Sequence, residues 1–363
     1  MFNQIYKGKT VVVTGHTGFK GAWMTSWLLK LGANVVGISI DVPTKPSLFE
    51  TMNLKDKITD YRIDVREIGK LKEIILNSNP DFLFHLAAQP IVSSSYLDPL
   101  YTFSTNVMGT VNVLESLRYL ENKCVAIIVT SDKCYDNVEW VWGYKESDNL
   151  GGKDIYSGSK GAAELVFKSY YNSFFVNHKY VTVASARAGN VIGGGDWAKD
   201  RIVPDCMNAW HASNSVEIRS PKATRPWQHV LEPISGYLNL AQNLSINFKL
   251  NGESFNFGPK SEHSQTVVKL LEDLSKYWNL SISPYKITDN IQFHEAGLLK
   301  LNCDKSLFYL KWLPVLEYSE LIEFTSKWYF EFFNNNNSIA DFTLNQISDY
   351  EKKAINRNIQ WTI

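Results

Sequence analysis

Three polar residues near the middle of the chain could do acid–base chemistry. The apolar run CVAIIVT (124–130) leads directly into Ser131, Asp132 and Lys133. Aspartate and lysine are seldom buried unless they are paired. An acid and an ammonium at the end of a buried strand therefore have two interpretations: a salt-bridged turn, or an acid and a base that act on a substrate.

A tyrosine and a lysine form a second candidate pair. Tyr156 and Lys160, in DIYSGSKGAAEL, are four residues apart in a predicted helix, so their side chains share one face. An ammonium near a phenol favours the phenolate, so we expect a lowered pKa for Tyr156. Such a tyrosine can take the proton of a sugar hydroxyl beside a nicotinamide. A surface pair is the alternative, because this spacing is common by chance.

A glycine-rich loop follows the first predicted strand. In TGHTGFKGAW, Gly15, Gly18 and Gly21 lie between a strand and a helix. Glycines let the backbone turn sharply and approach a pyrophosphate, and the helix N-terminus favours its negative charge. The context predicts a dinucleotide site, with a plain structural turn as the alternative.

Two acids after later strands could complete that site. Asp41 lies 20 residues beyond Gly21, which suits a carboxylate that binds the adenosine ribose and selects NAD over NADP. It could equally be a solvated strand-end residue, and the basic Lys20 could tolerate a 2′-phosphate. Asp64 could face the adenine or be an ordinary loop acid.

Strands and helices alternate through the first half of the chain, which predicts a Rossmann-like, doubly wound parallel α/β sheet. Ligands in such sheets bind at the carboxyl ends of strands, where residues 131–133 would lie. The predicted strands are 10–14, 34–40, 61–65, 81–87, 124–130 and 180–186. The predicted helices are 19–31, 67–77, 98–120 and 155–176.

The pattern changes after about residue 190. We expect an NAD-binding domain over 1–190 and a smaller mixed α/β substrate domain over 191–363, with some exchange of chain between them. Gly193, Gly194 and Gly195 are expected to form a flexible run. Later predicted elements are helices 202–213, 230–246, 264–277 and 317–333, a strand at 216–219, an Asn-rich loop at 334–337 and a helical tail.

The composition excludes several classes of protein. Of 363 residues, 44% are hydrophobic, so we expect a packed core. Lysine plus arginine and aspartate plus glutamate both number 37, which argues against a nucleic-acid partner. No apolar run suggests a signal peptide or membrane span. The four cysteines form no CxxC pair, so we expect reduced thiols, no metal site and a cytoplasmic protein.

Seven stretches together resemble the extended short-chain dehydrogenase/reductase family, which acts on nucleotide sugars. The resemblance covers nearly the whole chain, and within the family it points to the 4,6-dehydratases of CDP-sugars. HTGFKG and SDKCY are far more specific than the glycine spacing. The stretches are TGHTGFKGAW, HLAAQPIVSSSY (85–96), VTSDKCYDN, YSGSK, ARAGNVIGGGDW (186–197), RPWQHVLEPISGYL (225–238) and HEAGLLKLNCDKS (294–306).

The resemblance implies bound NAD, a nucleotide-sugar substrate, and a homodimer or homotetramer built through the two long helices. Tyr156 and Lys160 would be the redox pair. The expected cofactor-site residues are Gly15, Thr17, Gly18, Phe19, Gly21, Asp41, Asp64, Val65, Ala87, Ala88, Asn106, Tyr156 and Lys160. The expected substrate-site residues are Gln89, Ser131, Asn190, Arg201 and Arg225, the two arginines having ion-paired alternatives.

A 4,6-dehydratase oxidises C4, eliminates water across C5 and C6, and returns the hydride to C6. The elimination needs an acid and a base beyond Tyr156, and we assign Asp132 and Lys133 to these roles. Related dehydratases place Glu where Lys133 stands, so the pair favours the CDP-sugar branch. Neighbouring strand residues point to opposite faces, so the backbone must turn after Ser131 for both side chains to share one sugar.

Three alternatives stay open. One is a 4,6-dehydratase of another NDP-hexose. A 4-epimerase or reductase would need Tyr156 and Lys160 but no acid–base pair at 132–133. A dinucleotide-sensing regulator with this fold could dispense with YxxxK, which is intact here.

Overall fold

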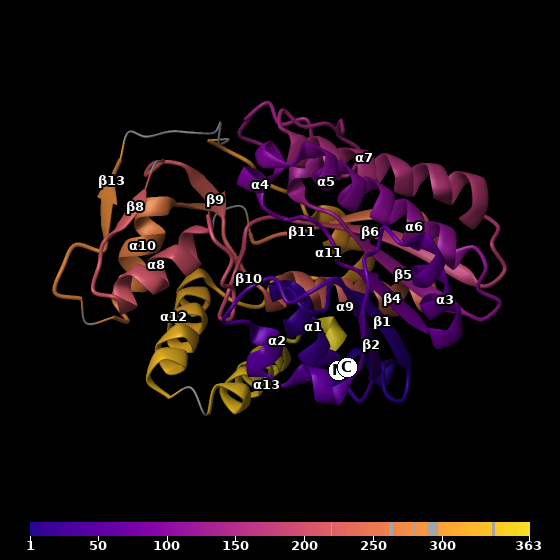
Figure 1. Cartoon of the computed structure of the whole chain (residues 1–363), viewed down its shortest axis with the longest axis horizontal. Coiled ribbons are helices and arrows are strands. Elements are labelled where there is room, and N and C mark those ends of the chain that lie inside the picture. The colour runs from indigo at the N-terminus through magenta and orange to yellow at the C-terminus, as the bar shows by residue number, and fades with distance from the viewer. Residues whose placement is uncertain (219, 261–263, 279, 289–296, 336–337) are drawn as a thin grey trace.

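The computed structural model describes residues 1–218, 220–260, 264–278, 280–288, 297–335 and 338–363. A larger lobe built on a parallel sheet lies beside a smaller lobe of short strands and helices (Figure 1). The predicted fold class is confirmed.

A seven-stranded parallel sheet forms the centre of the larger lobe, in the order β11-β6-β5-β4-β1-β2-β3. The order reverses beside β1, which makes the sheet doubly wound. Its strands are β1 (Thr10–Thr14), β2 (Asn34–Ser39), β3 (Thr59–Arg62), β4 (Phe82–His85), β5 (Cys124–Val129), β6 (Val181–Ala188) and β11 (Ser254–Phe257).

Helices cover both faces of this sheet (Figure 1). Alternate strand residues enter the two cores: Val11 and Val13 pack with Trp23 of one core, and Val12 packs in the other with Leu71. This two-sided burial explains why the strands read as continuous apolar runs. One layer contains α3 (Ile68–Ser78), α6 (Gly109–Leu117) and α7 (Ile155–Tyr170), and the other contains α1 (Phe19–Lys30), α9 (Leu231–Ile246) and α13 (Ile339–Asn356).

The smaller lobe is built from paired short strands and three helices. The pairs are β7 (Val191–Ile192) with β10 (Gln228–His229), β8 (Val216–Ile218) with β13 (Tyr285–Ile287), and β9 (Thr224–Pro226) with β12 (Ser264–Thr266). The helices are α8 (Ile202–His211), α10 (Val267–Ser275) and α12 (Tyr318–Asn334). Shorter helices elsewhere are α2 (Leu48–Thr51), α4 (Val92–Leu97), α5 (Pro99–Phe103) and α11 (Asp304–Leu310).

The second half of the chain also returns to the larger lobe. β11 adds the edge strand beside β6, and α9 packs against β5 and β6. The termini meet, because the Asn3 amide donates to the Ile363 carbonyl at 2.8 Å and the Phe2 ring stacks on Trp361. The proposed division at residue 190 stays a prediction, with this exchange of chain as part of it.

Several predicted boundaries differ from the structure. β3 begins two residues earlier than predicted, at Thr59, and ends at Arg62. The predicted helix at 264–277 starts only at Val267, because β12 pairs with β9 and the Thr266 side chain caps α10. The tail helix starts as early as Ile339. Residue 219, residues 294–296 of the seventh stretch, and residues 336–337 lie outside the described residues.

The sequence predicts a flexible glycine run at 193–195, but the structure shows these residues closely packed. All three residues are buried. A Cβ on Gly194 would lie 1.9 Å from the Trp328 ring, and Gly195 has a φ of +80°. Glycine is required here because α12 approaches the backbone closely.

Candidate active site

The chain leaves the sheet directly after β5. Ser131 is still extended, with φ −160° and ψ 159°, and a 3-10 turn (Asp132–Cys134) begins at the next residue. The Ser131 hydroxyl accepts from the Lys133 amide at 3.2 Å and donates to Asp132 Oδ1 at 2.9 Å. Asp132 and Lys133 are therefore not fixed on opposite faces of a strand, which is the geometry that a shared substrate requires.

The Asp132 carboxyl is suited to hold a proton. The residue is 3% exposed, and burial raises its pKa against the opposing charge of Lys133. Its Oδ2 atom is buried without a hydrogen-bond partner, and a Cβ on Gly189 would lie 3.1 Å from that atom. This is the direction of pKa shift that a general acid needs. Lys133 itself is half-buried.

Tyr156 and Lys160 lie near this turn, on the first half of α7. Both are buried, and Lys160 Nζ is 6.0 Å from the centre of the Tyr156 ring. Burial raises the pKa of Tyr156 to about 12, although a hydrogen bond with Ser131 and the charge of Arg201 oppose the rise. The expected lowering is therefore wrong for the protein alone, because desolvation outweighs the charge of Arg201 and the hydrogen bond with Ser131. Burial also lowers the pKa of Lys160 to about 8.

Lys20 belongs to the same cluster, which the sequence did not indicate. Its Nζ lies 3.4 Å from the Tyr237 hydroxyl. Burial and the charges of Arg201 and Lys160 lower its pKa to about 8, against the charge of Asp132. Lys20 therefore lies beside the turn that carries Asp132, and not only at the cofactor loop where the sequence analysis considered it. The only signal in the sequence was its position in the first turn of the helix that follows the glycine loop.

Arg201, a predicted substrate residue, lies close to Tyr156 and Lys20. It pairs with Asp196 at 2.9 Å, and its charge lowers the pKa of both Tyr156 and Lys20. A third of its side chain is exposed. The structure thus brings together Ser131, Asp132, Lys133, Tyr156, Lys160 and Arg201.

The glycine loop forms a tight cradle at the start of α1. Gly15 has a φ of +75°, and a Cβ there would lie 2.7 Å from the Ala87 amide. A Cβ on Gly21 would lie 2.1 Å from the Gly15 carbonyl oxygen. Gly18 caps α1, and Phe19 is its first residue. Only glycine fits two of these positions, which leaves bare backbone at a helix N-terminus, as a pyrophosphate group requires.

The other predicted cofactor residues line the adjoining strand ends. The Thr17 hydroxyl donates to the Asp41 carbonyl at 2.6 Å, and the Asp41 residue is exposed. Ala87 and Ala88 follow β4, directly opposite Gly15. Asp64 lies two residues beyond β3, paired with Arg66 at 2.5 Å, and Val65 is buried beside Gly109.

The remaining predicted residues are held by contacts within the protein. Gln89 is buried, and its side chain binds Thr102 and Ile91. Asn106 joins Gln89 to Ser159 of α7 at 2.8 Å, so it braces α7. The Asn190 carbonyl accepts from Gln228 in the smaller lobe. Arg225 is buried on β9 and donates to the carbonyls of Thr224 and Gly297, at 3.0 and 3.3 Å.

The sequence model for GDP-mannose 4,6 dehydratase matches residues 12–322. The chain belongs to the GDP-mannose 4,6 dehydratase family. Within this family, a CDP-glucose 4,6-dehydratase of Salmonella typhimurium is 45% identical over 95% of this chain and 97% of the relative. A CDP-paratose 2-epimerase of Salmonella typhi is 26% identical over 75% of this chain and 85% of that protein. The resemblance found in the sequence motifs is confirmed.

Solved structures share the fold of this family member. A dTDP-glucose 4,6-dehydratase, DesIV from Streptomyces venezuelae, was solved with NAD and TYD bound. It superposes with a TM-score of 0.77 at 20% identity, over 89% of this chain and 97% of that one. The epimerase Mth375 of Methanothermobacter thermautotrophicus superposes with a TM-score of 0.79 at 20% identity, over 93% and 96%.

Within the part of the chain that the structure describes, no three His, Cys, Asp or Glu side chains gather as a metal ion would require. No described helix is long and apolar enough to cross a membrane.

Proposed function

We propose that this chain is a CDP-glucose 4,6-dehydratase that forms CDP-4-keto-6-deoxyglucose and water. The observation that carries the proposal is the 45% identity, over nearly the full length of both chains, to a CDP-glucose 4,6-dehydratase. The Asp132–Lys133 turn beside Tyr156 supports it, because an epimerase would need the tyrosine but not the second acid–base pair.

The redox step uses groups at the start of α7. The residues of the glycine cradle fit NAD and would hold its pyrophosphate, and the bound cofactor would supply hydride transfer from C4 and back to C6. Tyr156 accepts the proton of the 4-hydroxyl, with Ser131 as its hydrogen-bond partner. The positive charges of Lys160 and Arg201 lie close to Tyr156 and favour its phenolate form, which is the form that accepts a proton.

The elimination uses the turn after β5. The 4-ketone acidifies the C5 hydrogen, and Lys133 removes that proton. The resulting Lys133 ammonium returns the proton to C5 when the hydride is delivered to C6. Asp132, whose pKa is raised by burial, protonates the departing 6-hydroxyl. Lys20, Lys160 and Arg201 supply positive charge close to this turn.

We also propose NAD as the cofactor and a homodimer or homotetramer as the assembly. Exposed apolar side chains along α4, α5, the following helical turn and α7 support the assembly, since such surfaces mark interfaces. They are Leu97, Leu100, Phe103, Met108 and Leu165. The preference for NAD rests on Asp41, which is exposed two residues beyond the end of β2.

The cellular compartment and the pathway are inferred from the same family. We propose a cytoplasmic enzyme whose product feeds deoxysugars into surface polysaccharide, such as the O-antigen of lipopolysaccharide. All four cysteines are unpaired thiols, as is usual in a reducing compartment.

The test is incubation of the purified protein with CDP-glucose. The proposal expects a 4-keto-6-deoxy sugar, seen as near-ultraviolet absorbance after addition of alkali. GDP-, dTDP- and UDP-hexoses run in parallel decide the nucleotide. Activity with only one of these three would overturn CDP-glucose as substrate. Failure of all four nucleotide sugars, CDP-glucose included, to give a keto sugar would overturn the dehydratase reaction.

A further inference from the structure

A buried ion pair lies behind the turn that carries Asp132 and Lys133. Glu164 comes from α7 and Arg187 from β6, and Oε2 of the first lies 2.7 Å from Nη2 of the second. Their side chains are 1% and 3% exposed. A charge at such depth persists only where partners satisfy it, so the contacts of this pair are well defined.

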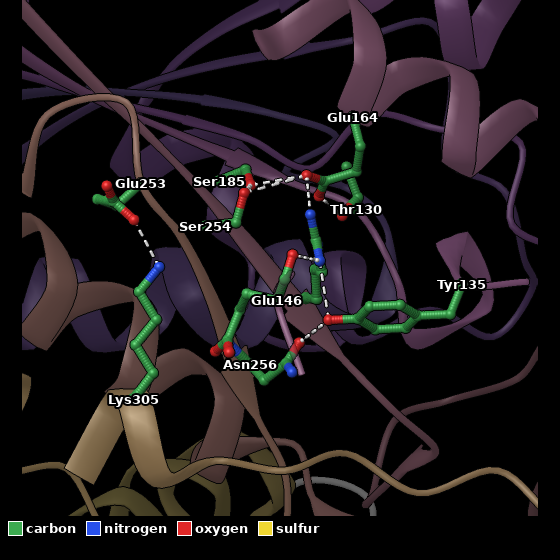
Figure 2. A network of polar contacts seen from close by, with 10 residues as sticks. Thr130, Tyr135, Glu146, Glu164, Ser185, Glu253, Ser254, Asn256 and Lys305 are labelled. Carbon is green, nitrogen blue, oxygen red and sulfur yellow. Dashed lines mark hydrogen bonds and ion pairs between the residues drawn. The ribbon is translucent and has the colours of Figure 1, made fainter. Parts of the chain in front are cut away.

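Each member of the pair binds one end of the turn. Thr130, which precedes Ser131, donates its hydroxyl hydrogen to Glu164 Oε1. Tyr135, which follows Cys134, accepts from Arg187 Nη1 at 2.8 Å. Figure 2 shows Thr130 beside Glu164 and the Tyr135 ring directed into the same network. Residues 131–134 are thus held between two tethers.

The network is anchored on the far side by the sheet edge. Ser185 and Ser254 both donate to Glu164 Oε2, at 2.9 and 3.3 Å. The Tyr135 hydroxyl donates in turn to Asn256 Oδ1 at 2.8 Å (Figure 2). These contacts fix the ion pair to β6 and β11, two strands that lie next to each other.

Glu164 also belongs to α7, the helix that carries the proposed redox pair Tyr156 and Lys160. Tyr156, Lys160 and Glu164 recur every four residues along α7, so they lie on one face. Burial acts to raise the pKa of Glu164, but Arg187 and the hydrogen bonds outweigh it and the net pKa is lowered. The carboxylate therefore stays ionised near neutral pH and keeps both tethers.

We propose that Glu164, Arg187 and Tyr135 are positioning residues that hold the turn of residues 131–134 in its place beside α7. They act through residues 131–133 and touch no substrate. Displacement of a catalytic group by about 1 Å can cost about a hundredfold in rate. The inference rests on the proposed dehydratase function, because it divides that reaction into a step by α7 and a step by the turn.

The test uses Tyr135→Phe, which removes one hydroxyl and keeps the ring. The matched control is Tyr144→Phe, whose ring stacks on Tyr135 at 5.2 Å but whose hydroxyl bonds to Asn137 and Val138. In a single turnover with CDP-glucose, Tyr135→Phe should slow elimination about tenfold while C4 oxidation keeps its rate. Absorbance of reduced cofactor should then rise before product forms, and the control should resemble wild type. Equal slowing of both steps, or none of either, would overturn the inference.

A second readout needs neither substrate nor cofactor. Amide hydrogen exchange of the peptide over 130–136 should be faster in Tyr135→Phe than in Tyr144→Phe, while the α7 peptide is unchanged. Equal exchange in the two variants would contradict the positioning role. If Tyr135→Phe does not fold, the same measurements are made on Thr130→Val, which removes the hydrogen bond to Glu164. Failure of the wild type to convert CDP-glucose overturns the proposed function instead, and the exchange result still decides whether the network holds the turn.

Discussion

The proposed elimination depends on single side chains at the end of β5. Asp132 is buried with a raised pKa, while Lys133 is half-buried one residue later, in a turn that Ser131 caps. A buried acid with a raised pKa and a lysine in the same turn are the two groups that the proposed elimination adds to the redox pair. On the proposed assignment, Asp132 and Lys133 are the two residues that distinguish this site from that of an epimerase.

Lys133→Met tests the base directly. Methionine keeps the length of the side chain but removes the amine, so C4 oxidation should proceed and elimination should be lost. Reduced cofactor should accumulate with substrate, as followed by near-ultraviolet absorbance, without 4-keto-6-deoxy product. Lys145→Met, on an exposed lysine of the next loop, is the control and should behave as wild type. Normal product formation by Lys133→Met would remove this lysine from the mechanism.

At the scale of elements, the site depends on how closely α1 approaches the turn after β1. The Gly21 Cα lies so near the Gly15 carbonyl that no side chain fits between them. This contact places both the glycine cradle and Lys20, which comes from the first turn of the same helix. One packing contact thus serves the cofactor cradle and the catalytic cluster together.

Gly21→Ala should disturb that contact. The new Cβ would lie 2.1 Å from a backbone oxygen, so α1 must shift. We expect a loss of about 1–3 kcal/mol in the free energy of unfolding and weaker NAD binding, measured by urea unfolding and equilibrium dialysis. Gly69→Ala on α3 is the control, because its Cβ meets open space and should leave both values near wild type. An unchanged Gly21→Ala protein would refute the close-packing argument.

Over the whole molecule, a buried carboxyl joins the sheet layer to the C-terminal region. Glu232 of α9 accepts from the amides of Val315 and Leu316 and from the Tyr350 hydroxyl. Burial raises its pKa to about 7. Because the folded-state pKa is above that of the unfolded chain, the stabilisation is complete below the unfolded pKa and is lost as pH rises through about 7.

This linkage predicts a pH-dependent stability. Through Glu232, the free energy of unfolding should be about 2 kcal/mol lower at about pH 8.5 than at about pH 5.5. Glu232→Gln should remove that part of the slope, whereas Glu272→Gln, on an exposed acid, should retain it. Urea unfolding at several pH values measures the difference, and parallel profiles for wild type and Glu232→Gln would contradict it.

The sequence predicted the alternating strands and the end of β5, because buried parallel strands have long apolar runs and charged residues interrupt them plainly. It stated a turn after Ser131 only as a requirement for a shared substrate, and the structure supplies that turn. It did not predict Lys20 in the cluster or the tight packing at Gly194, since both depend on segments distant in the chain. The Glu164–Arg187 pair had a weak signal: an arginine within the apolar strand β6, and an acid at the four-residue spacing of Tyr156 and Lys160. Periodicity shows which face a residue occupies, but not its partner on another element.

The fate of the hydrogen on C4 tests the central claim most directly. The protein would be incubated with CDP-glucose that carries deuterium at C4, and the sugar product examined by nuclear magnetic resonance. The account predicts a 4-keto-6-deoxy sugar with the deuterium in its C6 methyl group, since the hydride taken from C4 returns to C6 after elimination. Deuterium returned to C4 of a hexose without loss of water would show epimerase or reductase chemistry and would contradict the account.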